Sequence, residues 1–181
     1  MSTIAVKKIK LGDNVDLSKN FLIEVPSVAD GTLTIKRENG TAVLSIAADG
    51  VINLNAAWQT YTPSIEGGTT EGVGTYGARE GEYLDLGSVV FFRARVDWSA
   101  HTGTGSMNIT LPTMADINPV TPLATYANGV NVGTNNTPLF MVTGVQRAQL
   151  YGINSVSGGS VNIPSMDTVG SVAVSGCYRK A

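Results

Sequence analysis

Residues 81–112, GEYLDLGSVVFFRARVDWSAHTGTGSMNITLP, decide the fold of this chain. Every second residue from Val90 to Trp98 is apolar, and the residues between them include two arginines and an aspartate. A period of two places these two sets on opposite faces of one strand, so one face packs on a core and the other meets water or a polar partner.

The second half of the same stretch contains another alternating run. A turn-rich loop from Ser99 to Ser106 is followed by Met107–Leu111, in which apolar and polar residues again alternate, and Pro112 closes it because proline cannot donate to a ladder. The pattern predicts a β-hairpin made of Val90–Trp98 and Met107–Leu111.

The composition favours many short strands and tight turns. Among 181 residues, 43% are apolar but only 14% are charged, well below the average of about 25%, and 21 are glycine. A net charge of −2 provides no basic field for nucleic acid and no polybasic patch for an anionic membrane. We therefore expect neither nucleic acid nor membrane as a partner.

The start of the chain, MSTIAVKKIKLGDNVDL, contains basic residues but no apolar run typical of a secretory signal. We expect no signal peptide, synthesis in a cytoplasm, and no membrane insertion. A single cysteine and a single histidine, Cys177 and His101, cannot form an intrachain disulfide or a Cys/His zinc site. We expect no metal or other cofactor, and stability from packing and association.

Residues 1–54 form a first, stem-like part of short apolar pieces between turn signals. Asn39–Gly40 predicts a hairpin, because both residues can take the positive φ values of a type I′ turn. Pieces of four to six residues with few large side chains cannot close a core alone, so we expect other copies of the chain or a larger body to cover them. The expected strands are Ile4–Ile9, Phe21–Val25, Thr32–Ile35, Ala42–Ile46 and Val51–Leu54.

Residues 55–181 hold both tryptophans and the tyrosines, so we expect the core there. Strand patterns at roughly 8–12-residue spacing, without helical periodicity, predict an antiparallel β-sandwich, jelly-roll-like, as a head domain. A short helix fits only Thr113–Ile117. The expected strands are Trp58–Thr62, Gly72–Ala78, Glu82–Leu86, Val89–Trp98, Met107–Leu111, Leu123–Val132, Leu139–Thr143, Gln146–Ile153, Ser160–Ile163 and Ser171–Arg179.

The sequence resembles proteins of tailed bacteriophages. WQTYTPSI, GTYGAREGEYLDLGSVVFFRARV, TGTGSMNITLP and the final VAVSGCYRK resemble the head domain of fibre, receptor-binding and decoration proteins, and the stretch from KIKLGDNVDL to VINL resembles the segment before such heads. The resemblance implies a homotrimer with a non-enzymatic role in the virion.

The residues suited to catalysis do not form a catalytic motif. We expect His101 to be a solvated loop residue, because a Ser/His/Asp site also needs a positioned acid and oxyanion donors. We expect Cys177 to be a buried or half-buried structural thiol. The carboxylates, most of them beside glycine in turns, are expected to be solvated rather than a hydrolytic pair: Glu66, Glu71, Glu80, Glu82, Asp85 and Asp97.

The glycine-rich and Asp-Gly segments predict loops rather than ligand sites. EGGTTEGVG and SGGS lack the Gly-Lys-Ser/Thr ending and the helix of a phosphate-binding loop. Asp30–Gly31 and Asp49–Gly50 do not continue into the acidic alternation of an EF-hand loop, so turn chemistry explains them.

Recognition of another molecule's surface is the chemistry that remains, since it needs only exposed aromatics and polar loops on a rigid frame. The alternative is that most of the tyrosines pack in the core or at a subunit contact, and that Arg93 and Arg95 face solvent or pair with acids of a neighbouring subunit. The candidates for stacking on sugars or for polar contacts are Tyr61, Tyr76, Tyr83, Tyr126, Tyr151 and Asn135, with Asn128, Asn131 and Asn136 nearby in the loops.

Two functions remain open. In the first, the protein is a tail fibre or receptor-binding protein whose head contacts a host surface glycan or protein. In the second, it is a capsid decoration protein or head fibre. In both, residues 1–54 attach to other virion proteins in a particle assembled in the host cytoplasm.

Overall fold

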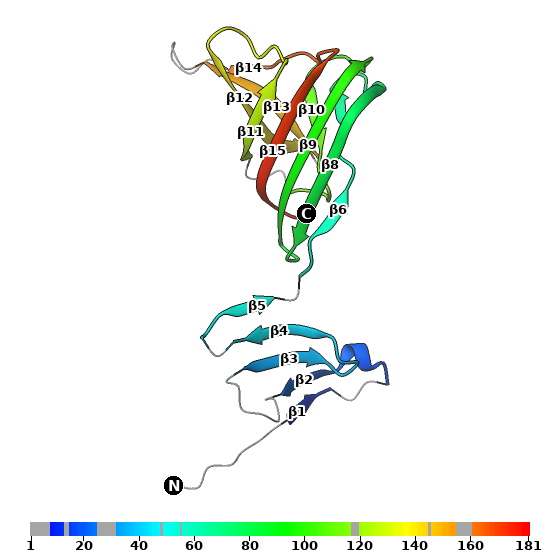
Figure 1. The fold of residues 1–181 in the computed structure, drawn as a ribbon, viewed down its shortest axis with the longest axis vertical. Helices are drawn as coiled ribbons and strands as arrows, with labels where there is room; N and C mark the ends of the chain where they lie inside the picture. Colours follow the sequence, from blue (N-terminus) through cyan, green and yellow to red (C-terminus); the bar gives the residue numbers. More distant parts are fainter. Residues whose placement is uncertain are drawn as a thin grey trace. The chain divides into compact units, whose positions relative to one another are not determined.

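A computed structural model of the chain divides into two compact units, Met1–Ala56 and Ala57–Ala181, called here the stem unit and the head unit. The prediction of a mainly β chain is confirmed, because the described residues form antiparallel strands and no α-helix (Figure 1). The structure describes residues 8–12, 15–24, 32–47, 49–54, 56–116, 120–144, 146–154 and 161–181.

The stem unit is a single five-stranded antiparallel sheet whose strands follow in sequence order. A short 3-10 turn, Leu17–Lys19, begins at Asp16, whose carboxylate accepts from the Ser18 amide. Apart from Leu22, no described apolar side chain of this unit is fully buried. The strands are β1 (Lys8–Leu11), β2 (Phe21–Glu24), β3 (Leu33–Arg37), β4 (Ala42–Ile46) and β5 (Ile52–Leu54).

The predicted hairpin around Asn39–Gly40 joins β3 to β4, but its turn is not type I′. Gly40 has a φ of 92°, whereas Asn39 is not among the residues with positive φ. The Gly40 amide donates to Arg37 O at 2.9 Å, and the Arg37 amide donates to Thr41 O at 2.8 Å. This arrangement is typical of a type I turn followed by a glycine bulge, which needs only one left-handed residue.

The head unit is built from a ten-stranded antiparallel sheet that curls until its two halves face each other. One half has the order β6-β8-β9-β15-β11 and the other β11-β12-β13-β10-β7, and β14 pairs with β13. The strands are β6 (Gln59–Tyr61), β7 (Ile65–Gly67), β8 (Gly74–Asp85), β9 (Val89–His101), β10 (Met107–Thr110), β11 (Thr121–Asn128), β12 (Asn136–Gly144), β13 (Arg147–Asn154), β14 (Val161–Asn162) and β15 (Gly170–Arg179).

Strand β11 connects the two halves. Its first residues, Thr121–Leu123, pair with β12, and its later residues, Ala124–Asn128, pair with β15. In Figure 1, β11, β15, β9 and β8 lie side by side as one layer.

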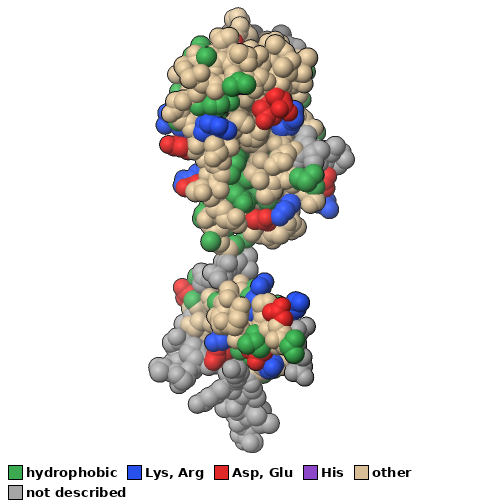
Figure 2. All heavy atoms as spheres, turned by 90° about the vertical axis from the view of Figure 1, so that its right-hand side faces the viewer, with side chains coloured by type: hydrophobic (Ala, Val, Ile, Leu, Met, Phe, Trp, Pro, Cys, Tyr) green, Lys and Arg blue, Asp and Glu red, His purple; other side chains and the backbone are tan. Residues whose placement is uncertain are grey.

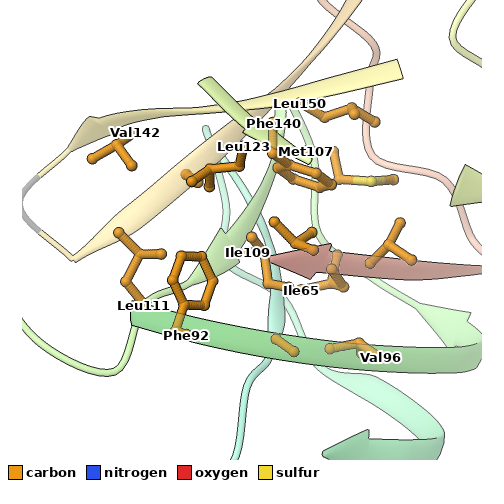
Figure 3. Close-up of a cluster of buried hydrophobic side chains, with 14 of the residues drawn as sticks. Ile65, Phe92, Val96, Met107, Ile109, Leu111, Leu123, Phe140, Val142 and Leu150 are labelled. Atoms are coloured by element: carbon orange, nitrogen blue, oxygen red, sulfur yellow. The ribbon is translucent and has the colours of Figure 1, made fainter. Parts of the chain in front are cut away.

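The core of the head lies between the two halves. Figure 3 shows Phe92 and Val96 of β9 pointing toward Phe140 and Val142 of β12, with side chains from β7 and β10 between them. The alternation read from the sequence predicted the β9 contribution, since Val90, Phe92, Ala94, Val96 and Trp98 are all buried.

The hairpin predicted between Val90–Trp98 and Met107–Leu111 is wrong. β9 pairs with β8 and β15, whereas β10 pairs with β7 and β13 in the other half of the sheet. The segment between them crosses the head, and Thr104 bonds through its backbone to Thr70 instead of closing a turn. Alternation determines which face of a strand is buried but not which strand lies beside it.

Two further expectations differ from the structure. The strands expected at Gly72–Ala78 and Glu82–Leu86 are one long strand, β8. Its register with β9 shifts between residues 75 and 78. Thr113–Asp116 forms a bend and an isolated bridge from Ala115 to Lys180 rather than a helix. Residues 4–7, Asp30–Gly31, Ile117 and the SGGS cluster lie outside the described residues.

Candidate functional site

A hollow of about 590 Å³ lies on the outer face of β8, β9, β15 and β11, the face turned away from the core, and is called here the outer groove. Its volume falls within the range of about 300–1,000 Å³ that is usual for small-ligand sites. The residues whose side chains point outward into it are Glu80, Glu82, Arg93, Arg95, Ala124, Tyr126, Ala173 and Ser175.

The groove exists because small side chains lie between larger ones in two rows across the sheet. In the first row, Glu82, Arg93, Ser175 and Ala124 are successive cross-strand partners. In the second row, Glu80, Arg95, Ala173 and Tyr126 are successive partners. Ala and Ser on β15 and β11 therefore form a floor, with charged side chains on one flank and Tyr126 on the other.

An apolar row borders the groove at one end. Leu84, Phe91 and Cys177 are cross-strand partners on the same outer face. Phe91 is 41% exposed and the Cys177 thiol is also exposed, so the expectation that Cys177 is buried is wrong. Its side chain points outward because β15 alternates and Val174 and Tyr178 take the inward positions.

Both arginines of the groove form ion pairs within the chain. The Arg93 guanidinium donates to Glu82 Oε2 from Nε at 2.8 Å and from Nη2 at 2.6 Å. Arg95 donates through Nη2 to Asp97 Oδ2 at 2.6 Å. Adjacent basic and acidic side chains are also visible over both units in Figure 2. Two arginines and two glutamates give the groove lining no net charge.

The Arg95–Asp97 pair is held in place by a third side chain. The Ser171 hydroxyl donates to Asp97 Oδ1, and this hydrogen bond together with Arg95 lowers the pKa of Asp97 below its ordinary value. The same carboxylate raises the pKa of Arg95. An arginine has five N–H donors, so this pairing leaves donors of Arg95 for a ligand.

Three of the tyrosines considered as binding residues pack against the core instead of lining the groove. Tyr61 and Tyr83 meet edge to face, and burial raises the pKa of Tyr61. The Tyr83 hydroxyl donates to Gln59 Oε1 at 2.9 Å, and the Tyr76 hydroxyl donates to Ile65 O at 3.2 Å.

The other predicted site residues lie apart from one another. Tyr126 is 59% exposed and is the tyrosine that lines the outer groove. Tyr151 is a half-buried residue of β13, in the other half of the sheet. Asn135 is exposed before β12 and has a positive φ of 60°, typical of a turn residue. The predicted residues therefore do not form one site.

His101 is not the solvated loop residue that we expected. It is the last residue of β9 and only 6% exposed. The Gly103 amide donates to Nδ1 at 2.9 Å, so Nε2 carries the proton and donates to Ile65 O at 2.9 Å. The imidazole ties the loop after β9 to β7, because both of its nitrogens are used in backbone contacts.

The carboxylates lie mainly on strands, so the expectation that most are in glycine turns is wrong. Glu66 is in β7, Glu80, Glu82 and Asp85 are in β8, and only Glu71 is in a loop. Within the part of the chain that the structure describes, no cluster of three or more His, Cys, Asp or Glu side chains could hold a metal ion.

Sequence reasoning missed the floor of the outer groove. A signal was present in SVAVSGC (171–177), where small residues alternate with valines, so small side chains occupy the outward positions of a strand. The groove also needs β15 to lie between β9 and β11, which are distant in sequence, and local patterns do not contain that information.

No family model matches this chain, and neither a curated protein nor a solved structure is significantly similar to it. Among the described residues, there is no helix long and apolar enough to span a lipid bilayer.

Proposed function

We propose that the protein is a non-enzymatic virion structural protein of a tailed bacteriophage, of the tail fibre or receptor-binding type. The head contacts a host surface, and residues 1–54 attach to other virion proteins. The observation that carries the proposal is the outer groove, which places the exposed Tyr126 beside two arginines and two glutamates on a rigid sheet.

The groove suits a surface glycan. A sugar presents an apolar ring face, which stacks on an aromatic side chain, and hydroxyl groups, which need donors and acceptors. Tyr126 supplies the first, and the N–H groups of Arg95 and the carboxylate of Glu80 supply the second. Because the charges of the lining balance, an uncharged saccharide fits better than a phosphate or a nucleic acid.

The assembly in this proposal is a homotrimer, with each head a jelly-roll-like antiparallel sandwich. The residues that resemble phage fibre heads, such as GEYLDLGSVVFFRARV (81–96), form β8 and β9 of the groove. A trimer carries three identical grooves. Together they bind a repetitive surface more tightly than one groove does, because the second and third contacts form within the same complex.

A capsid decoration protein or head fibre, bound to the capsid surface through the N-terminal segment, is the second candidate. The feature that favours it is the small stem unit, whose strands are three to five residues long. Such a unit gives a fibre little reach toward a host.

The two candidates are distinguished by incubating fluorescently labelled full-length protein with a panel of bacterial strains and with emptied phage heads. A receptor-binding protein binds one group of strains saturably and leaves the heads unlabelled. A decoration protein labels the heads and no strain. Binding to neither would contradict both candidates.

A further inference from the structure

Glu80 differs from the other charged side chains of the outer groove, because it forms no ion pair with the residues that the structure describes. Arg93 donates to Glu82 Oε2 from Nε at 2.8 Å and from Nη2 at 2.6 Å. Arg95 donates through Nη2 to Asp97 Oδ2 at 2.6 Å. Each arginine of the groove therefore has its own carboxylate partner, and the carboxylate of Glu80 is left over.

The Asp97 carboxylate holds Arg95 along its own strand. Glu80 is the cross-strand partner of Arg95, but the guanidinium bonds to Asp97, two residues further along β9. The Ser171 hydroxyl donates to Asp97, and with Arg95 it lowers the pKa of that carboxyl, so Asp97 is ionised at neutral pH. Asp97 therefore neutralises Arg95, and Glu80 attracts Arg95 only over a longer distance.

The surroundings of the groove therefore carry one unmatched negative charge. The lining alone has no net charge, but Asp97 adds a carboxylate at its edge. A neutral ligand that covers Glu80 removes water from a carboxylate without replacing it by a positive charge, which costs free energy. A ligand with a cationic group offsets that cost, whereas an anionic ligand increases it.

The shape of the groove sets the size of the ligand. Glu80 and Tyr126 stand at the two ends of one cross-strand row, with Arg95 and Ala173 between them. Three strand spacings of about 4.8 Å separate the two ends by roughly 14 Å along the sheet. This span is longer than one sugar ring, so a saccharide that contacts both ends contains more than one ring.

We propose that the outer groove binds an oligosaccharide with a free amino group, whose ammonium pairs with Glu80 while another ring of the same molecule stacks on Tyr126. The inference rests on the proposed recognition of a surface glycan and names the class of sugar. An ammonium has three N–H donors and a full charge, which suits a carboxylate without a cation. A lysine side chain also pairs with a carboxylate, but the exposed ring of Tyr126 favours a ligand with a flat apolar face.

The test is isothermal titration calorimetry of the full-length protein at pH 5.5, where sugar amines are protonated. Two tetrasaccharides are compared, one of glucosamine and one of N-acetylglucosamine, which have the same backbone and differ in whether the amines are free. Tetralysine is the third probe, since it carries amines without sugar rings.

Two variants complete the test. Glu80→Gln removes the unmatched charge of the groove, and Glu71→Gln removes the same charge from the loop between β7 and β8. Tryptophan fluorescence reports whether the head of each variant stays folded, since Trp98 lies in its core.

We expect the wild type and Glu71→Gln to bind the glucosamine tetrasaccharide roughly tenfold more tightly than the acetylated one, as for a hydrogen bond to a charged group. In Glu80→Gln this preference should disappear. Equal binding of the two tetrasaccharides by the wild type, or a preference that survives in Glu80→Gln, would overturn the inference and leave recognition of a glycan standing.

The remaining outcomes separate the inference from its alternatives. Tetralysine bound as tightly as the glucosamine tetrasaccharide would overturn the choice of a saccharide, and binding of neither tetrasaccharide would overturn the inference as a whole. A protein that shows the expected preference but labels no bacterial strain would contradict the proposed function and leave this inference standing.

Discussion

Gly81 lies opposite Tyr61 across β8 and β6, and the absence of a side chain leaves room for the tyrosine ring. A Cβ at this position would be 2.4 Å from Cε1 of that ring. An aromatic ring that covers a glycine in a neighbouring strand stabilises the pair, because the ring buries backbone that would otherwise be exposed. The Tyr61 hydroxyl makes no hydrogen bond with the described residues, so the ring is held by packing.

We predict that Gly81→Ala destabilises the head by about 1–3 kcal/mol, the usual cost of an added methyl group in a tightly packed place. Urea unfolding followed by tryptophan fluorescence measures the change. Gly77→Ala in the same strand is the matched control, since its Cβ would meet no atom closer than Asp97 Cβ at 4.0 Å. Equal losses in the two variants would show that the Tyr61 contact has no role.

The Asp85 carboxylate at the end of β8 binds both Lys180, near the C-terminus, and the turn that follows β8. The Lys180 ammonium donates to its carboxylate, and with the Gly87 amide this lowers the pKa of Asp85 below its ordinary value of 3.8. A carboxylate whose pKa is lower in the folded state stabilises the protein above the unfolded pKa, and that contribution is lost as the pH falls through the folded pKa.

We therefore predict that Asp85→Asn lowers the melting temperature by about 1–3 °C at pH 6, as expected for an ion pair that is partly open to solvent. The difference between wild type and variant should close as the pH falls below about 4. Calorimetry of both proteins between pH 6 and pH 2.5 gives the comparison. A difference that stays constant to pH 2.5 would mean that the ionised carboxylate is not the source of the stabilisation.

The β3–β4 and β4–β5 hairpins of the stem unit share one type of turn. Gly40 and Gly50 both have positive φ, 92° and 84°, and each donates through its amide to the residue three positions earlier. The side chains of Asn39 and Asp49 accept from the amides two residues later. The turn residues therefore fix the register of these three strands.

We predict that Gly40→Ala costs about 1–2 kcal/mol, because a left-handed backbone is strained for alanine. No atom lies within 4 Å of the added Cβ, so the loss comes from the backbone alone. Amide hydrogen exchange in residues 33–46 should become roughly five- to thirtyfold faster. Gly40→Asn should recover most of the protection, since asparagine tolerates this conformation, and an asparagine variant as fast as the alanine variant would contradict the explanation.

The sequence predicts which face of a strand is buried better than it predicts which strands pair with each other. The buried set from Val90 to Trp98 follows from a period of two, and the positions of most strands follow from turn residues. The pairing of β9 with β15 joins residues more than 70 positions apart, and no local pattern encodes it. The outer groove depends on that pairing, which is why Tyr126 could be proposed from sequence but its neighbours Ala173 and Ser175 could not.

The two units of the molecule differ in how they achieve stability. The head encloses a core that includes Phe140, Trp98 and Tyr178, whereas Leu22 is the fully buried apolar side chain among the described residues of the stem. A unit with its own core can fold in one copy, whereas the single sheet of the stem unit encloses little apolar surface of its own.

Binding of the full-length protein to an array of purified bacterial surface polysaccharides tests the proposed recognition. Tyr126→Ala removes the aromatic side chain of the outer groove, and Tyr151→Ala makes the same change on the other half of the sheet. We predict that wild type and Tyr151→Ala bind the same polysaccharides, and that Tyr126→Ala binds them at least about tenfold more weakly, as for the loss of a central aromatic contact. Unchanged binding by Tyr126→Ala would contradict recognition through the groove.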